Sequence, residues 1–248
     1  MDLCSGPPRT PYRAETMKRY FLTGTDTDAG KTLISAALLQ RAVLDGHTSF
    51  GLKPIASGSD QTDNGLRNRD ALLHQKYSSG NLAYEVHNPI TLEPAIAPHI
   101  AAKEAGLSLT CRSLIAACEN GLTQTAELQL IEGAGGWLVP LNDTETLADF
   151  AASQNLPVIL VIGLKLGCIN HACLTVEAIR QCGLTIAGWV ANSIDPDMEA
   201  QQENLRYLTQ WFHQRGMQHL GTVPHIRGID PFDANSLKQV SDRLHWPD

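Results

Sequence analysis

YFLTGTDTDAGKT, residues 20–32, contains the strongest structural signal in this chain. The first four residues are rich in aromatic and β-branched side chains and predict a strand over 20–23. Glycines and small polar residues follow. Apolar residues at helical spacing then predict a helix over 32–44 that stops at Gly46. The stretch is therefore a strand, a glycine-containing loop and a helix, in that order.

The loop of this unit, from Gly24 to Thr32, is typical of a phosphate-binding P-loop. Backbone N–H groups of such a loop converge on phosphate oxygens, and the helix N-terminus adds positive potential. Lys31 is placed to neutralise the β- and γ-phosphates, and the Thr32 hydroxyl can bind Mg²⁺. The usual spacing puts the first glycine at position 25, but the chain has Thr25 there and its glycine one residue earlier. A strand-to-helix turn without a ligand is the alternative; Gly-Lys-Thr at a helix start favours nucleotide binding.

Working outward, the chain alternates short apolar runs with longer amphipathic ones. We predict further strands over 49–53, 128–131, 158–162, 185–191 and 220–223, and helices near 69–76, 98–105, 112–121, 170–182, 198–215 and 235–244. Strands that alternate with helices are typical of a parallel sheet covered on both faces. The predicted class is therefore α/β, as a single-domain P-loop NTPase-like fold with a mostly parallel sheet and helices on both faces.

Length, charge and composition exclude several classes of protein. The chain has 248 residues, 43% of them hydrophobic, which suits one globular domain over 17–248. Residues 1–16 contain three prolines and no apolar core, so we expect a disordered N-terminal extension and no signal peptide. A net charge of -7 with scattered basic residues argues against a nucleic-acid partner. The apolar run at 157–164 is too short for a membrane span, and six cysteines without C-x-x-C spacing indicate reduced thiols in a cytoplasmic protein.

Glu132 is a candidate for the metal ligands that a P-loop needs. It ends the strand predicted over 128–131, and the carboxyl ends of parallel strands share one edge of a sheet. Four small residues, 133–136, follow it and allow the backbone to approach a phosphate closely. An acid at a strand end that only faces water is the alternative, and the run of small residues favours the metal-binding interpretation.

Lys53 is a candidate for a second cation near the γ-phosphate. It ends the strand predicted over 49–53, on the same edge of the sheet. A lysine at such a position is more often a solvated strand end, so position alone does not assign it a role. Ser57 by itself is typical of a turn, and composition does not distinguish Asp70 from the other acids nearby.

Four motifs, in order, make the sequence similar to dethiobiotin synthetases: GTDTDAGKT at 24–32, KPIASG at 53–58, EGAGG at 132–136 and KLGCINHA at 165–172. The similarity runs from about Lys18 to Pro224 and includes the longer P-loop. It implies an ATP-dependent ligase of biotin biosynthesis. In that reaction 7,8-diaminopelargonate takes up CO₂ as a carbamate, and ATP phosphorylates the carbamate to a carbamic–phosphoric anhydride. The neighbouring amine then closes the ring of dethiobiotin and releases phosphate.

The resemblance also implies roles for residues at matching positions. Lys31 and Lys53 would stabilise charge on the γ-phosphate and the carbamate. Thr27 and Ser57 would position these groups. The implied ligands of the cofactor Mg²⁺ are Thr32, Asp70 and Glu132. The other implied ATP-binding residues are Asp28, Ala29, Gly30, Leu33, Gly133, Ala134, Gly135, Asn192, Ser193, Pro224, His225 and Ile226.

The diamine's carboxylate is implied to bind at a helix start that includes Gly167, Cys168 and Asn170. Ser57 is implied to bind the substrate as well. A helix N-terminus suits a carboxylate, although Asn170 could simply cap its helix. The family's members are homodimers in which the tail of the diamine reaches the partner subunit. Asp28 and Ser193 depart from the family's pattern, which commonly has Glu and Asp at these positions.

The main alternative is a nucleotide-dependent switch ATPase of the partitioning or site-selection type. Such proteins usually carry a second lysine near the start of the P-loop, and residues 24–30 contain none. An amide-forming synthetase of cobalamin synthesis would need a glutaminase domain, for which 248 residues leave no room. ATP turnover that depends on the diamine separates the ligase from the switch.

Overall fold

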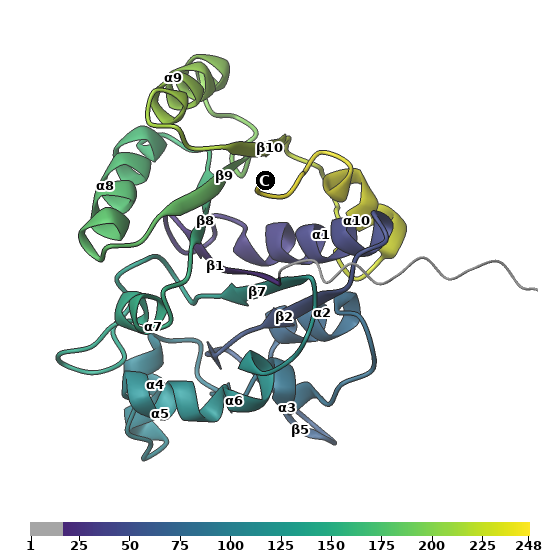
Figure 1. Cartoon of the computed structure of the whole chain (residues 1–248), viewed down its shortest axis with the longest axis vertical. Helices are drawn as coiled ribbons and strands as arrows, with labels where there is room; N and C mark the ends of the chain where they lie inside the picture. Colours follow the sequence, from purple (N-terminus) through teal and green to yellow (C-terminus); the bar gives the residue numbers. More distant parts are fainter. Residues whose placement is uncertain (1–16) are drawn as a thin grey trace, which may run out of the picture.

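The computed structural model describes residues 17–248, so the disordered extension predicted over 1–16 lies outside the described residues. A parallel sheet of six strands forms the centre, in the order β10-β9-β8-β1-β7-β2 (Figure 1). Its strands are β1 (Lys18–Gly24), β2 (Ser49–Leu52), β7 (Leu128–Glu132), β8 (Val158–Gly163), β9 (Ile186–Asn192) and β10 (His219–Val223). The predicted α/β class with a parallel sheet is confirmed.

Helices cover both faces of this sheet (Figure 1). The helices are α1 (Lys31–Leu44), α2 (Arg69–Tyr77), α3 (Tyr84–His87), α4 (Pro98–Glu104), α5 (Cys111–Ala117), α6 (Glu119–Leu122), α7 (Leu147–Ser153), α8 (Cys168–Gln181), α9 (Gln201–His213) and α10 (Ala234–Ser241). Successive residues of β1 point to opposite faces: Phe21 packs with α7, and Leu22 packs with α1 and α10. The prediction that helices cover both faces of the sheet is therefore confirmed.

Two small ribbons and two helices were not among the sequence predictions. β3 (Ile55–Ala56) pairs with β6 (Ile90–Thr91), and β4 (Asp60–Thr62) pairs with β5 (Gly65–Arg67). α3 and α7 are short, and short elements give little periodic signal. α7 does carry a local signal, because Thr146 and Asp149 form a capping box at its start. The single helix predicted over 112–121 is two helices, α5 and α6.

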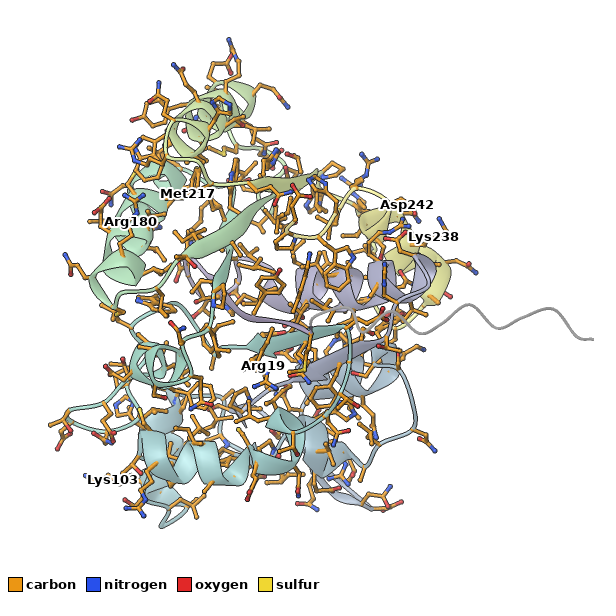
Figure 2. All side chains as sticks on the ribbon, viewed as in Figure 1. Arg19, Lys103, Arg180, Met217, Lys238 and Asp242 are labelled. Atoms are coloured by element: carbon orange, nitrogen blue, oxygen red, sulfur yellow. The ribbon has the colours of Figure 1, made fainter. Side chains whose placement is uncertain are left out.

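Charged side chains lie at the periphery and apolar ones in the interior. Figure 2 shows Lys103, Arg180 and Lys238 on the outside of three different helices, α4, α8 and α10. Within residues 17–248, no helix has the length and apolar character needed to cross a membrane. Two lysines, Lys31 and Lys53, are exceptions to this pattern, because they are buried at the carboxyl edge of the sheet.

Candidate functional site

The loop between β1 and α1 has the backbone shape of a phosphate cradle. Gly30 has a φ of 91° and ends the loop as the N-cap of α1, and Asp28 has a φ of 60°. A Cβ atom on Gly30 would collide with the side-chain amide of Asn192, whose Nδ2 donates to Ala29 O at 3.0 Å. Glycine is therefore required at position 30 for two reasons: the left-handed backbone and the close approach of β9.

Lys31 reaches back along the loop from the first turn of α1. Its Nζ atom donates to the carbonyl oxygen of Asp26 at 3.3 Å, and 7% of the residue is exposed. Burial, together with the positive charge of Lys53, lowers the pKa of Lys31 from 10.5 to about 8. An anion bound in the loop would offset this effect, so the site is electrostatically suited to phosphate.

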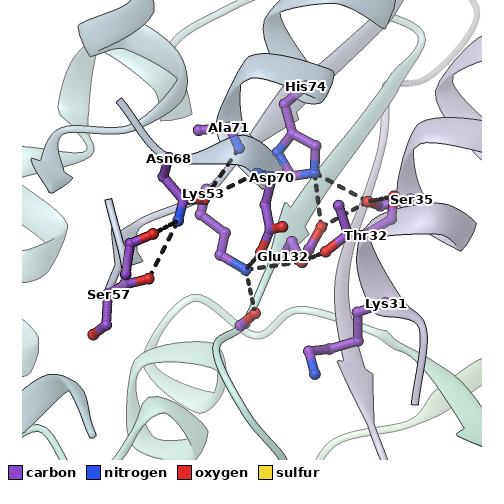
Figure 3. A network of polar contacts seen from close by, with 12 residues as sticks. Lys31, Thr32, Ser35, Lys53, Ser57, Asn68, Asp70, Ala71, His74 and Glu132 are labelled. Atoms are coloured by element: carbon purple, nitrogen blue, oxygen red, sulfur yellow. Dashed lines mark hydrogen bonds and ion pairs between the residues drawn. The ribbon is translucent and has the colours of Figure 1, made fainter. Parts of the chain in front are cut away.

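Lys53 occupies the centre of a buried polar network, shown in Figure 3. Its ammonium donates to Asp70 Oδ2 at 2.9 Å, to Glu132 Oε1 at 2.8 Å and to the carbonyl oxygen of Gly133 at 3.2 Å. β2 ends one residue before Lys53, β7 ends at Glu132, and Asp70 lies in the first turn of α2. The structure thus brings together three residues that the sequence could only place on separate elements.

Lys53 and Glu132 stabilise each other's charged form. Burial by itself would lower the pKa of Lys53, but Asp70 and Glu132 outweigh it and raise that pKa above its ordinary value. Burial would likewise raise the pKa of Glu132, but Lys53 and a hydrogen bond from His74 hold it well below its usual range. The network therefore holds the Lys53 ammonium, in its charged form, against the ionised carboxylate of Glu132.

Two residues that hold Glu132 were missed by the sequence analysis. Ser35 Oγ donates to Glu132 Oε2 at 2.6 Å, and His74 Nε2 lies 2.8 Å from the same oxygen. Ser35 comes from the second turn of α1 and His74 from α2. A spacing of four residues from Asp70 to His74 was the only available signal, because it puts both side chains on one face of a helix.

A cavity of about 710 Å³ opens beside this network. The residues that line it are Thr27, Asp28, Gly30, Lys31, Thr32, Lys53, Ser57, Asp70, Ala95, Ile96, Ala97, Pro98, Ala134, Gly135, Gly136, Leu138, Val139 and Pro140. Ser57 Oγ is buried there without a hydrogen-bond partner among residues 17–248. The Asn68 amide donates to Ser57 O and Gly58 O at 3.2 Å each, and its Oδ1 caps α2. Asn68 therefore holds the Ser57 loop and the helix of Asp70 together.

The oxygen atoms at the end of β7 and the start of α1 suit Mg²⁺. Thr32 Oγ1 lies 3.3 Å from Glu132 Oε1, close to the separation of about 3 Å between neighbouring ligands on an octahedral Mg²⁺. Asp70 adds a second carboxylate, which shares the Lys53 ammonium with Glu132. Hydroxyl and carboxylate oxygens are hard donors, so the three residues fit the ion that the sequence predicts.

The residues predicted to bind the nucleotide base lie at the carboxyl ends of β9 and β10. Asn192 ends β9 and contacts the P-loop, whereas Ser193 Oγ donates to Gln201 Oε1 at 3.1 Å. The stretch 224–226 directly follows β10, on the same edge of the sheet. Leu33 is half-buried on α1, where it packs against the apolar cluster of that face. These positions are outside the lining of the cavity, beyond the P-loop.

The predicted carboxylate-binding turn lies at the start of α8. Gly167, with a φ of 95°, is the N-cap of α8, so the interpretation of Asn170 as the cap is wrong: the helix begins earlier than its apolar periodicity indicates. Gly167 and Asn170 are exposed, and Cys168 is buried. An ion pair of 2.7 Å between Lys165 and Asp26 connects this turn with the P-loop.

The chain matches known proteins over most of its length. The model of the family described as "AAA domain" matches residues 18–232. The ATP-dependent dethiobiotin synthetase BioD of Cellvibrio japonicus is 54% identical over 78% of this chain and 84% of its own length. The protein of the same description from Marinobacter nauticus is 50% identical over 88% of this chain and 92% of its own. The solved cell division protein FtsY of Thermotoga maritima is similar with a TM-score of 0.49 and 13% identity, over 92% of this chain and 69% of that one. The two sequence relatives show that the chain belongs to the family of ATP-dependent dethiobiotin synthetases.

Proposed function

We propose that this protein catalyses the ATP-dependent carboxylation and ring closure of 7,8-diaminopelargonate to dethiobiotin, with release of ADP and phosphate. The observation that carries the proposal is the Lys53 ammonium between Asp70 and Glu132, beside a P-loop and a cavity of about 710 Å³. That cavity has room for the tip of a triphosphate and a small acceptor side by side. The names of the relatives point to the same reaction.

The first task of the site is to hold two anions together. A carbamate and a triphosphate repel each other unless fixed cations lie between them. The P-loop amides and Lys31 bind the β- and γ-phosphates from one side, and Lys53 faces the carbamate from the other. Because both lysines are buried and held in place, little reorganisation is needed when charge develops.

Phosphate transfer and ring closure then need orientation more than acid–base chemistry. The carbamate oxygen attacks the γ-phosphorus and ADP leaves, and the neighbouring amine attacks the carbamoyl carbon and displaces phosphate. Ser57 Oγ is buried beside the cavity with a free hydrogen-bonding capacity, so it can position the carbamate. Thr27, on the P-loop, lines the same cavity and can position the γ-phosphate.

Thr32, Asp70 and Glu132 would hold Mg²⁺. When bound, the ion neutralises charge on the phosphates. Glu132 is fully buried and ionised, so its negative charge is available at this position.

Four further features belong to this proposal. The nucleotide base would bind at Asn192 and Ser193 and at Pro224, His225 and Ile226. The diamine's carboxylate would bind at the start of α8 in a homodimer. One P-loop domain over 17–248 would carry the whole reaction. The proposed compartment is the cytoplasm, which keeps thiols reduced, and the five cysteines of the described residues are free thiols.

A product assay tests the proposed function. Purified protein with ATP, MgCl₂, bicarbonate and 7,8-diaminopelargonate should form dethiobiotin and ADP in equal amounts, measured by mass spectrometry and a coupled ADP assay. Omission of the diamine should abolish ADP formation. ATP hydrolysis that ignores the diamine would instead support a nucleotide-dependent switch.

A further inference from the structure

His74 is a fully buried histidine that touches the edge of the site and does not line the cavity. Its Nε2 atom lies 2.8 Å from Glu132 Oε2 and 3.1 Å from Ser35 Oγ. Its other ring nitrogen, Nδ1, is buried without a hydrogen-bond partner among the described residues. All the polar contacts of this ring therefore point to Glu132 and Ser35, as Figure 3 shows.

The two oxygens of Glu132 face different groups. Oε1 faces the site, with Lys53 Nζ at 2.8 Å and Thr32 Oγ1 at 3.3 Å. Oε2 faces away from it and meets Ser35 and His74. Rotation of the carboxylate would break the contacts of both oxygens together. The orientation of Oε1 is thus determined in part by what binds Oε2.

The contact also assigns the proton on His74. An ionised carboxylate only accepts hydrogen bonds, so Nε2 carries the hydrogen and donates it to Glu132. Ser35 Oγ donates to the same oxygen, which leaves its lone pairs directed at the imidazole N–H. Two donors on one oxygen define the plane of the carboxylate better than one.

Helix α2 explains how His74 reaches this position. Asp70 and His74 are four residues apart, so they share the face of α2 that is turned to Lys53 and Glu132. Gly51, on β2, leaves room for the ring: a Cβ atom there would lie 2.8 Å from His74 Cγ. One helix face therefore places Asp70 on Lys53 and His74 on Glu132.

We propose that His74 is a positioning residue, whose Nε2–H bond to Oε2 holds Glu132 with Oε1 turned to the metal and the γ-phosphate. The inference rests on the proposed function, in which Glu132 is a ligand of Mg²⁺. Hydrogen-bond partners behind a metal-binding side chain orient it, and their loss typically costs about 10–100-fold in metal affinity or activity. His74 acts through Glu132 and touches neither substrate nor metal.

The test measures how strongly Mg²⁺ tightens the binding of a non-hydrolysable ATP analogue, β,γ-imido-ATP, by isothermal titration calorimetry. The ratio of its Kd in EDTA to its Kd in MgCl₂ is the coupling, and it requires no turnover. His74→Leu keeps the volume and removes the donor, whereas the amide of His74→Gln can still reach Oε2. His74→Asn is too short to reach it and replaces the Leu variant should that variant not fold. His219→Gln is the matched control. His219 lies in β10, away from Glu132, and its ring stacks on that of Trp189 with the ring centroids 4.3 Å apart.

We expect His74→Leu and His74→Asn to lower the coupling about ten-fold, with Kd in EDTA within about two-fold of the wild type. His74→Gln should keep the coupling within about three-fold, and His219→Gln should leave it unchanged. Unchanged coupling in His74→Leu, or equal weakening of both Kd values, would overturn the inference and leave His74 a packing residue. A Gln variant that behaves like Leu would also overturn it. Wild-type binding that ignores Mg²⁺ would remove the metal assignment itself, whereas the diamine-dependent assay tests the reaction separately.

Discussion

Lys31 and Lys53 are both buried lysines at one edge of the sheet, yet their pKa values move in opposite directions. Burial dominates at Lys31, and its pKa falls to about 8. Two carboxylates outweigh burial at Lys53, and its pKa rises. The difference fits two roles: Lys53 is a fixed charge of the protein, and Lys31 gains its partner when a nucleotide binds.

The lowered pKa of Lys31 predicts how nucleotide binding depends on pH. A bound phosphate raises this pKa again, so binding above pH 8 takes up a proton and weakens as the pH rises. We expect the affinity for MgADP to fall about ten-fold between pH 7 and pH 9. Calorimetry at both pH values, in buffers of different ionisation enthalpy, measures the affinity and the proton uptake. Lys31→Arg, which stays charged, should bind with little pH dependence over this range.

The lowered pKa of Lys31 also affects how the free energy of unfolding changes with pH. Between pH 8 and pH 10.5 the folded protein binds fewer protons at Lys31 than the unfolded chain does. The contribution of Lys31 to the free energy of unfolding therefore becomes more favourable as the pH rises through this window. For nucleotide binding, an affinity of the wild type that does not change between pH 7 and pH 9 would contradict the assignment of Lys31 as a phosphate-binding lysine with a lowered pKa.

Lys53→Ala should destabilise the fold as well as stop turnover. The substitution leaves Asp70 and the fully buried Glu132 without their shared cation, and breaking a buried ion pair in this way costs about 3 kcal/mol. Chemical denaturation should show this loss in the free energy of unfolding. MgCl₂ should restore part of it, because the ion can bind the same carboxylates.

The matched control for Lys53→Ala is Lys238→Ala. Lys238 pairs with Asp242 at 2.6 Å on the exposed face of α10, seen in Figure 2. Exposed pairs of this kind contribute about 0.5 kcal/mol. A similar loss of stability in the two variants would show that the Lys53 network does not stabilise the fold.

At the scale of elements, the close packing of α2 on β2 brings Asp70 and His74 to the site. Gly51→Ala should disturb it, because the new Cβ would lie 2.8 Å from His74 Cγ and from Leu39 Cδ1. Overpacking of this kind costs about 1–3 kcal/mol. We expect both the free energy of unfolding and kcat to fall, since α2 must move away from Lys53.

Gly46→Ala separates the loss of activity from the loss of stability. Gly46 has a φ of 88°, and a Cβ atom there would meet nothing within 4 Å. Its substitution should cost about 1 kcal/mol of backbone strain without lowering kcat. If Gly51→Ala lost stability but kept its kcat, the position of α2 would not matter for the chemistry.

Sequence periodicity was sufficient to predict the strands whose ends form the site. β1, β7 and the P-loop were predictable because a strand–loop–helix order and its glycines are local features. The contact of His74 with Glu132 was not predictable from the sequence, because it depends on how closely α2 approaches β2. The start of α8 was misplaced by two residues, since a left-handed Gly167 can begin a helix without a polar cap.

For the whole molecule, the distribution of exposed apolar side chains predicts the contact of the proposed homodimer. Leu166, just before α8, is 90% exposed, and Leu174, on α8, is 62% exposed. Helix α8 lies at the edge of the molecule in Figure 1. Leu174 and Asn170 are four residues apart on one face of that helix. An apolar surface around the predicted carboxylate-binding turn is typical of an interface between subunits.

Leu166→Glu should therefore convert the dimer to a monomer, because it places a charge where the two apolar surfaces meet. Light scattering should give about twice the chain mass of 26.9 kDa for the wild type and about 27 kDa for the variant. The KM for the diamine should rise at least about ten-fold, since the tail of the diamine would lose the partner subunit, while the Kd for nucleotide should stay within about two-fold. Leu44→Glu, at an exposed apolar position on the end of α1, should change neither mass nor KM. A monomeric variant with an unchanged KM for the diamine would show that each subunit binds its substrate alone, and a dimeric one would place the interface elsewhere.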